Sequence, residues 1–185
     1  MRLPDLPLWA WVALGVAAIG LSGIGVWTMQ RRYAPGSQEA VNLLAAAAAR
    51  AGLPAKWATS KATHELMHRE SGGWVGRPNY TFGAVSSVVR AAEWPLVWAR
   101  LRAGEVWTKS TATGLGQLLA SNAHKYYPDG LMGIGDPLNE AVGLLRYIAD
   151  RYGSPQIALA MHGATGIYVH GITGKVRTKK FKEGY

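Results

Sequence analysis

Residues 64–68 read His-Glu-Leu-Met-His, which is the HExxH pattern of zinc metallopeptidases. In such a site His64 and His68 would bind the metal from one face of a helix, and Glu65 would act as the base. At 100° per residue, however, both histidines point away from the alanine-rich side of the helix, which should face the core. We therefore expect two solvated histidines and keep a zinc peptidase as an alternative function.

Glu70 ends the same predicted helix, which spans 54–70, but lies on its small and apolar side. The negative end of the helix dipole and removal from water both favour a protonated carboxylic acid. An acid that keeps its proton near neutral pH is what protonation of a glycosidic oxygen requires. Glu70 is therefore a candidate general acid, and the alternative is a side chain turned outward at a frayed helix end.

Caps and prolines predict that most of the chain beyond residue 36 is helical. Ser37 is expected to cap a helix that ends at Gly52, and Asp136, followed by proline, opens one that ends at Gly153. Residues 72–113 are mixed, with turn chemistry at several points. Further helices are expected at 54–70, 95–102, 114–127 and 155–162, with a short strand at 167–172. The predicted fold class is mainly α with a small irregular or β insertion.

Two sets of apolar residues are expected to build the core. The helix that follows Asp136 has an inward stripe at helical spacing, and a group of tryptophans in the 74–113 insertion is expected to form a smaller satellite core. The alternative for the tryptophans is sugar stacking or cover over a cleft. The stripe is Leu138, Ala141, Val142, Leu145, Ile148, Ala149 and Tyr152, and the tryptophans are Trp94, Trp98 and Trp107.

Residues 8–29 form an uncharged stretch of 22 residues with tryptophans at both ends. As a helix this stretch is about 33 Å long, which matches a hydrocarbon core of roughly 30 Å. Arg31 and Arg32 follow at once, and positive charge there predicts that the rest of the chain faces the cytoplasm. We expect one transmembrane helix, and a cleaved signal peptide is the alternative.

Charge is distributed unevenly along the 185 residues. The chain has 20 Lys and Arg against 11 Asp and Glu, a net charge of +9 and no cysteine. Because the first 29 residues contribute one Arg and one Asp, the whole excess lies beyond them. Absence of cysteine excludes disulfides and thiol catalysis. A basic domain suits anionic polymers or lipids, and without a nucleic-acid motif we expect no specific nucleic-acid partner.

Four short motifs follow one another along the chain: Glu70-Ser-Gly-Gly73, Gly114-Leu-Gly-Gln117, Asp136-Pro-Leu-Asn139 with Gly143 and Tyr147, and Ala158-Leu-Ala-Met-His162. In this order they resemble the soluble lytic transglycosylase domain of the lysozyme-like superfamily. The resemblance covers roughly residues 38–164 and uses the same residues that the caps and stripes place on helices. Three departures stand out: glycine replaces the family's methionine at position 116, Met-His replaces Tyr-Asn at positions 161–162, and the insertion is long.

The resemblance implies an activity without a cofactor. Glu70 would protonate the bond between N-acetylmuramic acid and N-acetylglucosamine, and would then deprotonate the muramyl C6 hydroxyl to close a 1,6-anhydro ring. A muramidase-type hydrolase on the same fold is the near alternative. The resemblance further implies four substrate-binding residues: Ser71, Gln117, Tyr147 and His162.

The expected organisation has four parts. Residues 1–33 form the transmembrane anchor, 34–36 a linker, 37–164 the lysozyme-like domain and 165–185 a basic tail. The expected partners are glycan strands of peptidoglycan, a lipid bilayer through residues 8–29, and other virion or envelope proteins. The chain is similar to virion-associated transglycosylases of membrane-containing bacteriophages, which implies a single-pass protein of the virion internal membrane. A bacterial inner membrane is the alternative location.

Overall fold

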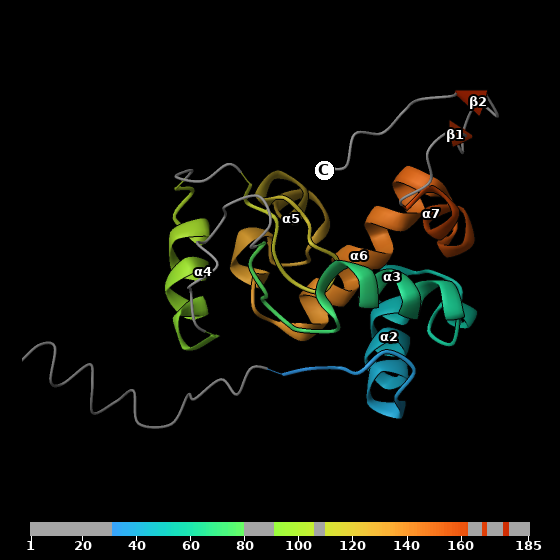
Figure 1. Ribbon diagram of the computed structural model, residues 1–185, viewed down its shortest axis with the longest axis horizontal. Helices are drawn as coiled ribbons and strands as arrows, with labels where there is room; N and C mark the ends of the chain where they lie inside the picture. Colours follow the sequence, from blue (N-terminus) through green and yellow to red (C-terminus); the bar gives the residue numbers. More distant parts are fainter. Residues whose placement is uncertain (1–30, 80–90, 106–109, 163–167, 170–175, 178–185) are drawn as a thin grey trace, which may run out of the picture.

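The computed structural model describes residues 31–79, 91–105, 110–162, 168–169 and 176–177, and this part of the chain is mainly helical (Figure 1). The predicted anchor at 8–29 and most of the basic tail lie outside the described residues. Among the helices that are described, none has the length and apolar character needed to cross a membrane. The helices are α2 Gln38–Ala51, α3 Lys61–Ser71, α4 Trp94–Arg102, α5 Ala120–Tyr126, α6 Pro137–Tyr152 and α7 Pro155–Met161.

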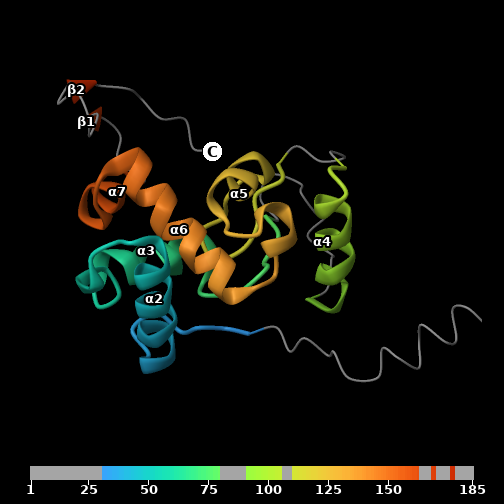
Figure 2. The same ribbon diagram turned by 180° about the vertical axis from the view of Figure 1, so that it is seen from behind.

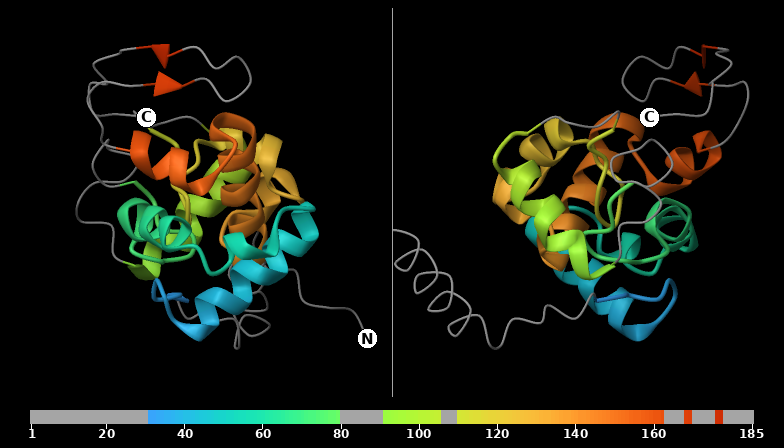
Figure 3. Two further views of the ribbon diagram at one scale, coloured as in Figure 1. Left: turned by 90° about the vertical axis from the view of Figure 1, so that its right-hand side faces the viewer. Right: turned by 60° about the vertical axis from the view of Figure 1, so that its left-hand side comes forward.

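Short turns and one hairpin connect and follow these helices. Three 3₁₀ turns, η1 Ala55–Trp57, η2 Ala91–Glu93 and η3 Gly130–Gly133, lie between them. Strands β1 Tyr168–Val169 and β2 Val176–Arg177 pair antiparallel beyond α7, and β1 lies within the region where a short strand was predicted (Figure 3).

The predicted caps of α2 and α6 are confirmed. The Ser37 hydroxyl accepts a hydrogen bond from the backbone of Ala40, and Gly52 ends α2 in the left-handed conformation. The Asp136 carboxylate accepts from the backbone N–H of Asn139 at 2.7 Å, and Gly153 ends α6. These contacts satisfy backbone groups that a helix end leaves unpaired, so both helices begin and end where the sequence indicates.

Two predicted helices are wrong in their extent. The helix expected at 54–70 is split, because residues 55–57 form the turn η1 and the α-helix starts only at Lys61. The helix expected from Gly114 starts at Ala120. Residues 113 and 118 pair through both their backbone N–H groups instead, at 3.1 Å each, so the intervening residues form a tight loop.

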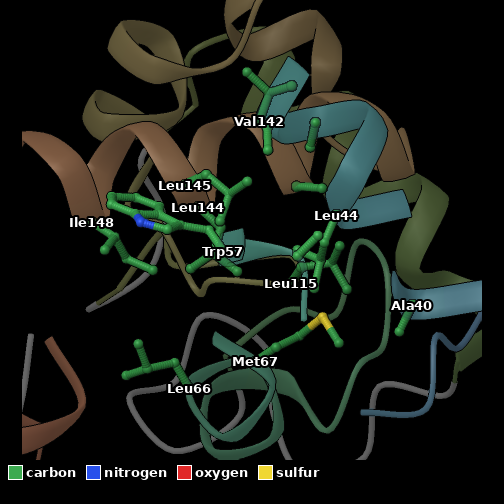
Figure 4. Packing of buried hydrophobic residues seen from close by; sticks show 14 of the residues in the cluster. Ala40, Leu44, Trp57, Leu66, Met67, Leu115, Val142, Leu144, Leu145 and Ile148 are labelled. Atoms are coloured by element: carbon green, nitrogen blue, oxygen red, sulfur yellow. The ribbon is translucent and has the colours of Figure 1, made fainter. Parts of the chain in front are cut away.

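Helix α6 runs through the middle of the molecule, with α2, α3 and α7 around one half and α5 around the other (Figures 1 and 2). Its predicted stripe is confirmed, because Ala141, Val142 and Leu145 are fully buried and Ile148 is nearly so. Leu44 of α2 and Met67 of α3 pack against this face (Figure 4). The end of α3 is thereby fixed against the centre of the fold.

A second cluster of buried residues contains α4 and α5. Trp94 and Trp98 are buried in it at 4% and 6% exposure, which confirms the predicted satellite core, while Trp107 lies outside the described residues. The Trp98 ring packs so closely on Gly76 that a Cβ there would lie 2.2 Å from it. Trp98 also donates its indole N–H to the Gly76 carbonyl at 2.7 Å. This cluster therefore supports the loop that follows α3.

The residues that follow the predicted membrane segment are packed onto the domain. Arg32 forms an antiparallel bridge with Trp74, and Tyr33 donates its backbone N–H to the Gly73 carbonyl at 2.9 Å. The Arg32 side chain donates to the Gly72 carbonyl at 3.0 Å and lies over the Trp74 ring. Gly73 is needed here, because a Cβ would lie 2.1 Å from the Tyr33 carbonyl oxygen. The segment expected as anchor end and linker is thus part of the folded domain.

Candidate active site

Glu70 and His162 meet although they lie 92 residues apart in the chain. Glu70 is near the end of α3 and His162 caps the end of α7, and these two helices pack on each other. The Oε1 atom of Glu70 lies 2.9 Å from Nε2 of His162, and the two side chains are 18% and 21% exposed. A partly shielded carboxylate with a titratable partner is a common arrangement for proton transfer. The alternative of an outward Glu70 at a frayed end does not fit this contact.

Ser71 has no exposed surface. Its hydroxyl donates to the Leu115 carbonyl at 3.0 Å and accepts the Gly73 backbone N–H at 3.1 Å. These bonds join the end of α3 to the loop at 114–117. Ser71 therefore fixes the position of Glu70, and its hydroxyl does not face a substrate.

Gln117 lies in that loop and is half-buried. Its side-chain amide donates to the Arg77 carbonyl at 2.7 Å and to the Gly114 carbonyl at 3.1 Å. Its φ of 47° is unusual for a residue with a Cβ, and such conformations are often found at functional sites. Gln117 closes the loop against the segment that follows α3.

Tyr147 lies on α6 between two other tyrosines. Its ring meets those of Tyr126 and Tyr152 edge-on, with centroids 5.6 and 6.0 Å away, and the Arg151 guanidinium lies 5.9 Å above it. Burial, together with the neighbouring Tyr152, raises the pKa of the Tyr147 phenol, and the Glu70 charge adds to this effect. The phenol therefore stays neutral over the physiological range. It lies within electrostatic range of Glu70.

Glu140 belongs to the same structural unit, although the sequence did not indicate it. Its carboxylate is fully buried and accepts hydrogen bonds from the backbone of Gly76 at 3.0 Å, Leu115 at 2.9 Å and Gly135 at 2.8 Å. Burial raises the pKa of Glu140 to about 7, although the three N–H groups act in the opposite direction. One side chain thus holds three loops together.

Gly114 makes room for that carboxylate. A Cβ at Gly114, whose φ is 79°, would lie 2.5 Å from Cδ of Glu140. The backbone of Leu115, the next residue, is held at both ends. Its N–H donates a hydrogen bond to the Glu140 carboxylate, and its carbonyl oxygen accepts one from the Ser71 hydroxyl. A continuous chain of contacts therefore runs from the buried carboxylate to the residue beside Glu70. Glycines at 76, 114 and 135 together with a glutamate four residues after a helix cap are the sequence signal for this arrangement.

The HExxH segment is not arranged as a zinc site. His64 is only 8% exposed, so the prediction that it is solvated is wrong, whereas His68 is exposed as expected. The Nε2 atom of His64 lies 2.9 Å from the Ala58 carbonyl, and Nδ1 accepts the Gly36 backbone N–H at 3.0 Å. Because a carbonyl only accepts, Nε2 carries the proton and neither ring nitrogen has a lone pair for a metal. The break before α3 places the Ala58 carbonyl there.

The neighbouring residues on α3 are not arranged as a zinc site either. Glu65 forms an exposed ion pair with Arg69 at 2.8 Å, one turn further along α3. Among the described residues no three His, Cys, Asp or Glu side chains are grouped so as to hold a metal ion. A groove with a volume of about 700 Å³ lies along this face, lined in part by Arg32, Lys61 and His68, and Glu70 does not line it.

The chain matches no protein-family model, no curated protein and no solved structure.

Proposed function

We propose that this chain is a peptidoglycan lytic transglycosylase with a lysozyme-like domain and that Glu70 is its general acid and base. The observation that carries the proposal is the shielded carboxylate of Glu70 at the end of α3, held against His162 from α7. The loop at 114–117 is fastened to the neighbouring residue Ser71. Residues from three of the sequence motifs are thereby brought to one region of the fold, and Tyr147 of the remaining motif lies within electrostatic range of Glu70.

Two other acidic residues, Glu65 and Glu140, are both engaged in other contacts, which favours a reaction that needs only one carboxylate. Glu65, the other acidic residue of α3, is exposed and paired with Arg69, and Glu140 is buried and bound to three backbone N–H groups. Neither is arranged as a second catalytic carboxylate, whereas most glycosidases use two. A single group that acts first as acid and then as base is sufficient for a transglycosylase.

The proposed reaction has two steps. Glu70 protonates the glycosidic oxygen between N-acetylmuramic acid and N-acetylglucosamine as the bond to C1 breaks. The carboxylate then accepts the proton of the muramyl C6 hydroxyl, whose oxygen bonds to C1 and closes the 1,6-anhydro ring. No water is consumed, and Glu70 is returned to its starting state. Gln117 and Tyr147 would contact the glycan strand beside it.

The cellular setting is part of the proposal. The uncharged segment 8–29 would span a membrane, and Arg31 and Arg32 would keep the domain on the cytoplasmic side during insertion. A virion with an internal membrane that assembles in the cytoplasm would enclose a domain with this orientation and deliver it to the cell wall at entry. The bacterial inner membrane, with the opposite orientation, is the competing location. Protease digestion of the tail from outside intact spheroplasts would contradict the virion location.

The proposal is tested by mass spectrometry of purified peptidoglycan after digestion by the full chain and by two variants. Glu70→Gln is expected to lower the release of anhydro-muramyl products at least about 100-fold, because the proton donor is lost. Glu65→Gln is the matched control, since Glu65 lies on the same helix, is exposed and bonds only to Arg69 among the contacts described for it.

Each outcome distinguishes one function from the others. Anhydro-muramyl ends that persist in EDTA support a transglycosylase, and reducing muramyl ends indicate a muramidase. Cut stem peptides that disappear with EDTA indicate a zinc peptidase. Full lysis by the Glu70→Gln variant would remove Glu70 from the mechanism.

A further inference from the structure

We propose that His162 is the positioning residue of Glu70 and that the two side chains together hold the single proton on which the reaction depends. This inference rests on the proposed function and deepens it. The family resemblance implies for His162 only a place beside the substrate. The structure instead places its imidazole against the carboxylate itself.

The contact requires a proton between the two side chains. The distance of 2.9 Å between Nε2 of His162 and Oε1 of Glu70 is that of a hydrogen bond, and two lone pairs at this distance would repel each other. The two side chains come from α3 and α7, so their separation is fixed by helix packing and not by local chain geometry. Both are about four-fifths shielded from solvent, which strengthens the interaction relative to an exposed pair.

Charged and titratable groups reach the pair from the helices that pack against it. From α3, Arg69 donates to the backbone carbonyl of His162 at 3.4 Å, and its charge is shared with Glu65 at 2.8 Å. From α6, the Tyr147 phenol remains neutral, and Arg151 lies over the Tyr147 ring. Residues 155–161 of α7 itself contain no titratable side chain.

The balance of these effects favours a proton on the imidazole. The hydrogen bond to Glu70 raises the pKa of His162, while burial and the Arg69 charge partly oppose this. A proton on Nε2 of the imidazole lies one hydrogen bond away from the Glu70 carboxylate, which is where the reaction needs it.

The proton balance of the reaction is then complete within the pair. The proton crosses from Nε2 to the Glu70 carboxylate and passes to the glycosidic oxygen as the C1–O bond breaks, which leaves a neutral imidazole beside a carboxylate. The C6 hydroxyl then bonds through its oxygen to C1 and gives its proton to Glu70. The pair regains the one proton with which it began, and no further reactant is needed.

The test compares His162→Gln with the wild-type chain, using the pH dependence of kcat/KM on purified peptidoglycan. Glutamine keeps an N–H donor near the position of Nε2, so Glu70 stays oriented, but glutamine cannot titrate. We expect the basic limb of the profile to move down by at least about one pH unit. At pH 7.5 activity should fall at least about tenfold, while at pH 5 it should stay within about threefold of wild type.

A second measurement follows the imidazole without any need for activity. In ¹H–¹⁵N spectra of the full chain, the His162 ring signal, assigned by correlation to the backbone resonances of His162, should titrate at higher pH in the wild-type protein than in Glu70→Gln. A histidine that shares no proton with Glu70 would titrate alike in both. This comparison holds even if the His162→Gln variant does not fold.

The outcomes separate this inference from the proposed function. If Glu70→Gln stops glycan cleavage but the His162→Gln profile coincides with that of the wild type, the shared proton is wrong and the transglycosylase stands. An unchanged His162 titration in Glu70→Gln overturns it equally. If Glu70→Gln still cleaves the glycan, the proposed function fails first.

Discussion

Replacement of Glu140 by glutamine tests how the buried carboxylate holds the site. Each carboxylate oxygen accepts two of the bonds: Oε1 those of Gly76 and Gly135, and Oε2 those of Gly76 and Leu115. In the variant one oxygen becomes an NH₂ group. The N–H of either Leu115 or Gly135 then faces a donor in a buried site, which costs about 1–3 kcal/mol.

The size of this effect depends on pH, because the wild-type side chain titrates. Burial raises the pKa of Glu140 from 4.5 to about 7, so the folded protein binds this proton more tightly than the unfolded chain does. The resulting stability is fully present below pH 4.5 and is lost as the pH rises through 7, and it amounts to about 3 kcal/mol. The glutamine side chain of the variant cannot titrate and lacks this dependence.

The assay is urea unfolding of both full-length proteins in a mild detergent between pH 4.5 and 8. The free energy of unfolding of Glu140→Gln should lie below that of the wild type at pH 4.5. Towards pH 8 the wild type should lose about 3 kcal/mol relative to the variant, so that the gap closes or changes sign. A gap that stays constant, or widens with pH, would show that the three N–H groups outweigh burial and would refute this reasoning.

Two further substitutions test other contacts by urea unfolding. Gly114→Ala should cost more than about 2 kcal/mol because its Cβ meets the Glu140 carboxylate at 2.5 Å, whereas Gly52→Ala, with nothing within 4 Å, should cost only about 1 kcal/mol. Equal losses would contradict the close contact. His64→Ala should cost about 2–4 kcal/mol, since the Gly36 N–H and the Ala58 carbonyl lose their partner, while His68→Ala should be nearly neutral. Similar small effects for both histidines would show that His64 is solvated after all.

Local signals predicted most of the helices. Ser37 and Asp136 accept the backbone hydrogen bonds that their types indicate, and the stripe of α6 faces the core because its spacing matches the helical period. The splitting of the helix expected at 54–70 was not predictable in this way. It depends on contacts of Ala58 and His64 that form only when the chain is folded.

The candidate site was predicted in part. Glu70 and His162 were named from their motifs, but their direct contact depends on how α3 packs on α7, which no local pattern specifies. Glu140 was missed because a charged residue in a helix is normally expected to be exposed. Its burial is understandable only once three glycine-containing loops, two of them distant in the chain, are seen to bring their N–H groups to it.

The bridge between Arg32 and Trp74 has a mechanical consequence for the membrane-tethered enzyme that we propose. It begins shortly after the segment expected in the membrane and fastens the chain just beyond Glu70. A domain attached in this way would have no flexible linker between Arg32 and its folded part. Its reach would be set by its own diameter, on the order of 35 Å, so it would act on glycan strands pressed close to the lipid surface.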